Sequence, residues 1–453
     1  MSDEVVMSLL TRALQSGDEY LAAAVHPAVL PTQRQSLEKL LFATSRGKRQ
    51  LAAAPYAPAS LLEALASDDD PKVRIRVARN PSTPARALGR LAGGDASTAL
   101  LSAIAAHKNA EPAILAVMQG MESPDIRAAL CGNPKTPLKT LRALLPAATL
   151  AERKILAGNP NADAAMLRDL WDSGDIYVRA EVAAHPAAGP GLMDEAKRSL
   201  DPLVRRMLAA NPAVTQDTLV ALLSDPEAAV RAAAVRHLAP DDHAPERLAS
   251  DPSSTVRRAE ARHFTLPASA AARLAGDRDH WVRRWLARNP GTPDFVLRRL
   301  ASDPESEVRR GVGRNRSCAV DLLRELAQDP VPWVRAGVAL REDAPVDILH
   351  RLGEQSDIDV ISAVGRNART PPSILERIVR HENADVRRAV ILNKRAPRSA
   401  LEAVLEDPYP LNRALLARHP SLSFADLETM LRDPEPQVRF TAADALVKRP
   451  RPN

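Results

Sequence analysis

The chain has few aromatic residues and few cysteines. Phe, Tyr and Trp make up 3% of its 453 residues, which excludes a compact core built on aromatic side chains. The two cysteines, Cys131 and Cys318, lack the spacing of a metal site, so neither a disulfide scaffold nor a zinc site is expected. We therefore expect no cofactor, no metal and a reducing compartment, the cytoplasm.

Long apolar runs are also missing. No apolar segment reaches the length that is needed to cross a bilayer. The first residues, MSDEVVMSLLTRALQSGDEY, lack the basic start and apolar stretch of a signal peptide. These absences predict a soluble protein without a membrane partner, and we expect a monomer.

Motifs that carry chemistry are absent too. The sequence contains no GxSxG elbow, P-loop, Rossmann glycine pattern or HExxH zinc motif. Its acidic residues mostly recur at a fixed spacing, so no carboxylate pair stands out as a general acid and base. The sequence therefore predicts a protein that is not an enzyme.

The composition favours many short helices. Apolar residues reach 45%, mainly Ala, Leu and Val, and 38 prolines accompany only 18 glycines. Prolines scattered through an Ala/Leu-rich chain are typical of short helices with sharp starts and ends. The net charge of +6 comes almost entirely from arginine, because the chain has ten lysines and none between Lys197 and Lys394.

A repeat of 26 residues runs through most of the chain. An arginine column recurs at this interval in twelve of thirteen positions: Arg127, Arg153, Arg179, Arg205, Arg231, Arg257, Arg283, Arg309, Arg335, Ile361 (the exception), Arg387, Arg413 and Arg439. Six residues later comes a column of Asn or His, and an Asp column includes Asp225, Asp251, Asp277, Asp303, Asp329, Asp407 and Asp433. Three coincident columns identify a repeat protein.

Each unit predicts two short helices. In WVRRWLARNP the side chains of Val282, Trp285 and Leu286 share one face, which we expect to be buried. Ala259 and Gly311 stand at the position of Trp285 in the adjacent units, so we expect small core residues to match a large one. The helix should end at Asn289, which tolerates the left-handed C-cap conformation and precedes a proline.

The second helix should start at Thr292-Pro293, an N-cap followed by a first-turn proline. It should bury Leu297, Leu300 and Ala301. Eight or nine residues make a short α-helix, which leaves 3₁₀ geometry open for either helix. A unit this small cannot bury its apolar face alone, so the units must stack into an all-α solenoid.

The phrases VRRWLARNPGTPDFVLRRLASDP, VRIRVARNPSTPARALGRLAGGD and VRRGVGRNRSCAVDLLRELAQDP resemble the leucine-rich repeat variant family. The resemblance implies a right-handed superhelix that pairs an α-helix with a 3₁₀-helix, here with about fifteen units. The DPxxxVR element is similar to HEAT-type repeats. The family's founding member has an iron–sulfur domain before its repeats, but no cysteine precedes Cys131 here, so that cofactor is not expected. We expect an N-terminal helical cap at 1–50, the solenoid at 51–445 and a frayed tail at 446–453.

Two column sets have structural explanations. Arg283, at the edge of the buried stripe, can reach Asp277 or Asp303, so we expect its column to tie repeat to repeat. The histidines of the Asn column should use a ring nitrogen where asparagine uses its amide, rather than bind metal. These histidines are His26, His107, His185, His237, His263 and His419.

A third set is the candidate partner-binding site. Arg284 and Arg288 lie one turn apart, opposite the buried stripe, and the adjacent units repeat this pair. We call the set the arginine–tryptophan surface; it comprises Arg258, Arg262, Arg284, Arg288, Arg310, Arg314, Trp281 and Trp333. Arginine beside aromatic rings suits acidic peptides, phosphates and stacked bases. The alternative is a solvated face, since Asp279, Glu305 and Glu307 lie close enough to neutralise part of it.

We expect a non-enzymatic scaffold or adaptor that binds a partner protein through an extended solenoid surface. The main alternative is a nucleic-acid-binding solenoid that uses the arginines. A remote alternative is a HEAT-like DNA-repair glycosylase, for which Trp281, Trp333 and Asp279 are the only material.

Overall fold

The computed structural model describes residues 45–53, 57, 59–93, 96–239, 245–263 and 265–448. They divide into two compact units, 45–239 and 245–448. The described part of the chain contains helices and no strands. The predicted all-α solenoid is confirmed, whereas most of the predicted cap at 1–50 and the end of the predicted tail lie outside the described residues.

In the unit 45–239 each repeat contributes a first and a second helix. The first helices are α4 (Ser45–Ala53), α6 (Pro71–Arg79), α8 (Thr98–Ala105), α10 (Pro124–Gly132), α12 (Leu150–Ala157), α14 (Ile176–Ala184), α16 (Pro202–Ala209) and α18 (Ala228–Val235). The second helices are α5 (Ala59–Leu65), α7 (Ala85–Ala92), α9 (Pro112–Val117), α11 (Leu138–Leu144), α13 (Ala164–Asp172), α15 (Pro190–Lys197) and α17 (Gln216–Leu222).

The unit 245–448 continues the alternation. Its first helices are α20 (Ser254–Ala261), α22 (His280–Arg288), α24 (Ser306–Gly313), α26 (Pro332–Ala339), α28 (Ile358–Arg366), α30 (Ala384–Ile391), α32 (Pro410–Leu416) and α34 (Pro436–Lys448). Its second helices are α19 (Pro245–Leu248), α21 (Ala268–Leu274), α23 (Asp294–Ala301), α25 (Val320–Leu326), α27 (Val346–Gly353), α29 (Pro372–Ile378), α31 (Arg398–Glu402) and α33 (Phe424–Met430).

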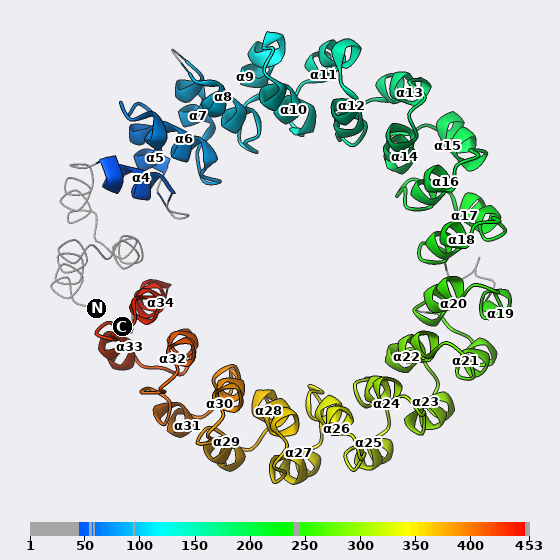
Figure 1. Ribbon diagram of the computed structural model, residues 1–453, viewed down its shortest axis with the longest axis vertical. Coiled ribbons are helices and arrows are strands. Elements are labelled where there is room, and N and C mark those ends of the chain that lie inside the picture. The colour runs from blue at the N-terminus through cyan, green and yellow to red at the C-terminus, as the bar shows by residue number, and fades with distance from the viewer. Residues whose placement is uncertain are drawn as a thin grey trace. The chain divides into compact units, whose positions relative to one another are not determined.

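The two kinds of helix form two rows within each unit (Figure 1). Successive first helices pack side by side, such as α22 on α24 and α24 on α26, and in the unit 245–448 they line the inner side of the curve. Both kinds are α-helices. The 3₁₀ geometry that the resemblance implied occurs in the described residues only as two short segments, η2 (Met118–Gly120) and η3 (Leu145–Ala147), which follow α9 and α11.

The core lies between the rows. In α22 the buried side chains are Val282, Leu286 and Ala287, and in α23 they include Leu297 and Leu300, close to the predicted stripes. Burying such side chains is the main gain from stacking, since a single unit would leave them in water. The predicted core positions Trp285 and Ala301 are both only partly buried.

The arginine column links each repeat to the next, as predicted. Arg283 on α22 reaches forward to Asp303, with Nε–Oδ2 at 2.6 Å and Nη2–Oδ1 at 2.9 Å. Its Nη1 donates backward to the carbonyl of Asp277 at 2.7 Å. One guanidinium therefore joins the turn before α22 to the turn before α24. Its side chain is 12% exposed and that of Asp303 is 6% exposed, so the pair is shielded from solvent.

The same arrangement forms a ladder. Ion pairs between an arginine and the aspartate 20 residues later join Arg205–Asp225, Arg257–Asp277, Arg283–Asp303, Arg309–Asp329, Arg387–Asp407 and Arg413–Asp433. Each aspartate also accepts a backbone N–H two residues on, as Asp303 does from Glu305 at 2.9 Å. Burial alone would raise the pKa of Asp277, but the hydrogen bonds from Arg257 and the Asp279 N–H outweigh it and lower that pKa.

The asparagine column forms a second ladder, in the buried interior. The side-chain amide of Asn289 donates to the carbonyls of Ala261 at 2.9 Å and His263 at 2.7 Å in the preceding repeat. Its Oδ1 accepts from the N–H of Gly291. The predicted left-handed conformation is wrong: Asn289 is extended, with φ −73° and ψ 120°. The proline after it favours this extended backbone, and the side chain is selected for its hydrogen bonds.

Histidine substitutes for asparagine as predicted at several positions. In His185, Nε2 lies 3.0 Å from the Asn159 carbonyl and Nδ1 accepts from the N–H of Ala187. His107 and His419 make the equivalent contacts. His237 is exposed instead, and His26 lies outside the described residues.

The threonine of the turn does not cap the second helix. The N-cap of α23 is Pro293, which makes no side-chain cap bond, so proline stands one residue earlier than predicted. The buried hydroxyl of Thr292 donates backward to the Leu286 carbonyl at 2.6 Å, as Thr83, Thr136 and Thr370 do in their own repeats. Thr292 therefore gives the Leu286 carbonyl a second donor at the C-terminal end of the first helix, beside the N–H of Asn289 at 3.0 Å.

We expect Arg283→Ala to lower the free energy of unfolding by about 2–3 kcal/mol, because it leaves the shielded Asp303 carboxylate without its cation. Thermal denaturation followed by circular dichroism measures the change. Arg316→Ala is the control, since Arg316 and Glu342 form an ion pair that is 78% and 85% exposed. Equal midpoints for the two variants would contradict a stabilising ladder.

We expect Asn315→Ala to cost about 2–4 kcal/mol, because three hydrogen bonds disappear from a buried site. These bonds join Asn315 to the carbonyls of Ala287 and Asn289 and to the N–H of Ser317, each at 2.8 Å. Asn315→His should lose less than half as much stability as Asn315→Ala, because His185 makes the equivalent contacts in the repeat that follows Asn159. Urea denaturation of the two variants provides the comparison, and a histidine variant as unstable as the alanine variant would refute the exchange.

Candidate functional site

The arginine–tryptophan surface lies on α20, α22, α24 and the start of α26, all within the unit 245–448. Its six arginines belong to successive first helices or to their C-caps, since Arg262 and Arg314 directly follow α20 and α24. Arg284 and Arg288 are not among the buried residues of α22: Arg288 is exposed and Arg284 is partly buried.

Two of the six arginines are neutralised. Arg258 binds Asp279 through Nη2–Oδ2 at 2.5 Å and Nε–Oδ2 at 3.0 Å. Arg284 lies 3.3 Å from Glu307, measured from Nε to Oε2. The predicted partial neutralisation is therefore real for these two, while Glu305 is the N-cap residue of α24.

The other four arginines lack a direct carboxylate partner in the described part of the chain. Arg262, Arg288, Arg310 and Arg314 form no ion pair with any carboxylate of the described residues. Three of them are exposed, and Arg310 is partly buried with its Nε enclosed and without a hydrogen-bond partner among the described atoms. A guanidinium has no lone pair to offer, so these groups can only donate, and an anion is the acceptor that also matches their charge.

The charges are close enough to affect one another. Burial lowers the pKa of Arg288, and the positive charges of Arg284 and Arg314 lower it further. Burial is also the main reason that the pKa of Arg310 is lowered, followed by the charge of Arg314. Both arginines remain protonated at neutral pH because the ordinary value is far above it. The nearby carboxylate of Glu307 opposes the lowering of the pKa at both arginines, so negative charge among them is favourable.

Trp285 belongs to this surface, which corrects the prediction that it fills the core. Its ring is partly exposed, and the guanidinium carbons of Arg262 and Arg288 lie 4.3 and 5.6 Å from the ring centroid. Helical periodicity misplaced it because position 285 lies at the boundary between the buried stripe and the exposed face. The repeat itself held the signal, since a tryptophan stands in a column of small residues.

Trp281 and Trp333 are each 40% exposed and also hold arginines. The guanidinium carbon of Arg284 lies 4.8 Å from the centroid of Trp281, and that of Arg310 lies 3.6 Å from the centroid of Trp333. Trp333 in addition donates its indole N–H to Glu307 at 2.7 Å. The rings hold these guanidiniums in place, and because Nε of Arg284 pairs with Glu307 and Nε of Arg310 is enclosed, only their other N–H groups can reach a ligand.

Small residues make room for the arginine stems. A Cβ at Gly311 would lie 2.9 Å from the Cβ of Ala287 and 3.3 Å from the Cγ of Arg288. A Cβ at Gly337 would lie 2.8 Å from the Cγ of Arg310. We predicted that small residues in this column match a large core residue. The structure shows that they let neighbouring first helices approach and the arginines lie across them.

Other chemistry has less support in the structure. Asp279, the candidate catalytic acid of a glycosylase, caps α22 and binds Arg258; burial would raise its pKa, but these hydrogen bonds lower it below its usual range. Both cysteines are buried, and burial raises the pKa of each thiol to about 11. The described residues include no cluster of three or more His, Cys, Asp or Glu suited to a metal ion. Among them, no helix has the length and apolar character that crossing a membrane requires.

Comparison with known proteins supports the predicted resemblance. Residues 280–305 match the model of the family described as leucine rich repeat variant. A solved structure described as a leucine-rich repeat variant with a novel repetitive structural motif is 25% identical, over 55% of this chain and 88% of its own, with a TM-score of 0.33. An engineered protein is 17% identical over 99% of this chain and 100% of its own, with a TM-score of 0.19. No curated protein matches the chain.

We expect Gly311→Ala to destabilise the protein by about 1–2 kcal/mol, because the new methyl group would push α24 away from Ala287. Gly191→Ala is the matched control: Gly191 lies in α15 with nothing within 4 Å of the new Cβ, so alanine should be neutral or stabilising by about 0.5 kcal/mol. Thermal denaturation compares the two. A neutral Gly311→Ala would show that the close approach of the first helices is not required.

Proposed function

We propose that this helical repeat protein, with its leucine-rich repeat variant unit at 280–305, is a non-enzymatic scaffold that binds an acidic segment of a partner protein. The binding site is the arginine–tryptophan surface. The observation that carries the proposal is the group of four arginines without carboxylate partners, Arg262, Arg288, Arg310 and Arg314, on consecutive first helices.

The geometry favours carboxylates for three reasons. The stacked guanidiniums present N–H edges, and a carboxylate pairs with such an edge through two parallel hydrogen bonds. Consecutive first helices repeat the edges at the helix-packing distance of about 10 Å, which about three residues of an extended peptide span. Arg262 is held in place by Trp285 and Arg310 by Trp333, so little side-chain entropy is lost on binding.

Nucleic acid is the alternative ligand, because guanidinium groups also bind phosphates. Its aromatic component has less support here. Base stacking needs an open ring face, and a guanidinium of the protein itself already lies against each of the rings of Trp281, Trp285 and Trp333, which leaves less ring surface for a base. A glycosylase has less support still, since its only candidate acid, Asp279, is held in an ion pair with Arg258.

The test titrates the full chain with a short glutamate-rich peptide and, separately, with a single-stranded oligonucleotide of equal charge at the same salt concentration. Tryptophan fluorescence reports binding, because three of the four tryptophans lie in this site: Trp281, Trp285 and Trp333. We expect the peptide to bind, and Arg288→Glu/Arg314→Glu to weaken it by about tenfold or more through lost ion pairs and added repulsion.

The control is Arg380→Glu/Arg432→Glu, which makes the same change of charge at exposed arginines that follow second helices. It should bind the peptide like the unmodified protein. Equal weakening by both double variants would show that only net charge matters. An oligonucleotide that binds about tenfold more tightly than the peptide would overturn the proposal in favour of nucleic acid.

A further inference from the structure

The arginine–aspartate ladder is interrupted in the repeat that contains α27 and α28. Gln355 stands where the ladder has aspartate, and Ile361 stands where it has arginine. His381, the residue with which an arginine at 361 would pair, is likewise not an aspartate. The step from Arg335 thus lacks its aspartate, and the next step lacks both its arginine and its aspartate. The ladder continues at Arg387–Asp407.

Arg335 is the last arginine before this gap, and it lacks its carboxylate. Its Nε donates to Oε1 of Gln355 at 2.8 Å, and its Nη1 donates to the carbonyl of Asp329 at 2.8 Å. In the regular steps Nη2 donates to a second carboxylate oxygen, as in Arg283–Asp303 and Arg309–Asp329. Gln355 offers only an amide nitrogen there, which cannot accept a hydrogen bond.

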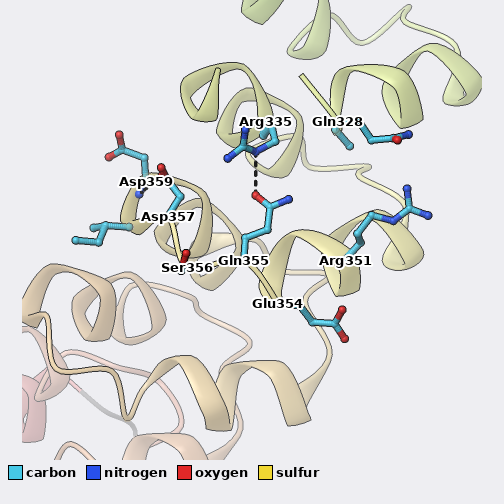
Figure 2. A pocket seen from close by; sticks show the side chains of 10 residues that line it. Gln328, Arg335, Arg351, Glu354, Gln355, Ser356, Asp357 and Asp359 are labelled. Atoms are coloured by element: carbon cyan, nitrogen blue, oxygen red, sulfur yellow. Dashed lines mark hydrogen bonds between the residues drawn. The ribbon is translucent and has the colours of Figure 1, made fainter. Parts of the chain in front are cut away.

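A hollow of about 1130 Å³ adjoins this gap. Figure 2 shows Arg335 and Gln355 at its centre, joined by their hydrogen bond, with Gln328 and Arg351 to one side and Asp357 and Asp359 to the other. Neither Arg335 nor Arg351 forms an ion pair with a carboxylate of the described residues. Asp357 and Asp359 therefore lie on the side opposite Arg351, whereas the acid Glu354 lies on the side of Arg351 (Figure 2).

Two of the acids already have partners. Asp357 caps α28 by accepting the N–H groups of Asp359 and Val360. Glu354 lies 3.3 Å from the ring of His350. The three acids of the lining outnumber its two arginines, which disfavours polyanions and phosphate dianions relative to a single carboxylate.

We propose that the hollow binds a carboxylate, which pairs with Nη2 of Arg335 and the amide nitrogen of Gln355 and so restores the missing ladder contact. The carboxylate comes from a small organic acid or from the free end of a peptide, since both present the same planar group. The site is independent of the arginine–tryptophan surface, because Arg335 belongs to the ladder column.

The experiment measures saturation-transfer NMR signals of acetate with the full chain, at constant ionic strength adjusted with chloride. We expect a saturable acetate signal for the unmodified protein. Gln355→Asp supplies the carboxylate from within, as the other repeats do, so it should reduce the signal about tenfold while raising the thermal midpoint. Because this variant gains a ladder contact, loss of binding cannot be attributed to unfolding.

N-acetyl-Gly-Gly and its C-terminal amide distinguish the sources of the carboxylate. Binding of both acetate and the peptide acid indicates a site for any small carboxylate, and binding of the peptide acid alone indicates a chain end. The proposal is overturned if neither acid binds, if the amide binds as well as the acid, or if Gln355→Asp leaves the signals unchanged. Failure of this test leaves the peptide titration at the arginine–tryptophan surface unaffected.

Discussion

The structure depends on an arginine that recurs in most repeats and whose guanidinium binds two successive turns, one behind it and one ahead. A 26-residue unit has too little apolar surface to fold alone, so its stability has to come from its neighbours. Arg283 meets this need by binding the carboxylate of Asp303 ahead and the carbonyl of Asp277 behind. Because Asp303 in turn receives Arg309 on its own carbonyl, the contacts continue from repeat to repeat. This ladder requires each arginine to stand at a fixed number of residues from its two partners, which explains the fixed spacing of the columns.

The buried amide ladder complements it. The arginine contacts lie in the shielded turns between repeats, whereas the Asn289 contacts lie in the buried interior, where unmet backbone carbonyls would be costly. Each asparagine satisfies two carbonyls of the preceding repeat, so it fixes the register between repeats as well as their separation. Histidine can replace it because an imidazole offers one donor and one acceptor at similar places.

Packing and register depend on these two columns, and the arginines of the arginine–tryptophan surface take no part in them. Position within the helix separates their roles: Arg283 is consumed by the ladder, whereas its neighbour Arg284 and the exposed Arg288 face outward. Residues that depart from the repeat mark the positions where one repeat differs from its neighbours in its contacts. Trp285 and Gln355 each break a column, and each changes the contacts of the arginines beside it.

The sequence by itself determined the repeat length, the two helices per unit, the arginine–aspartate contacts and the outward direction of Arg284 and Arg288. It could do so because a regular column fixes which residues recur at one place on successive helices. Only the tertiary structure decided the rest: Asn289 bonds across repeats, Thr292 closes the helix before it, and Trp285 lies between arginines. Those outcomes depend on distances between neighbouring repeats, and helical periodicity within one repeat carries no information about them.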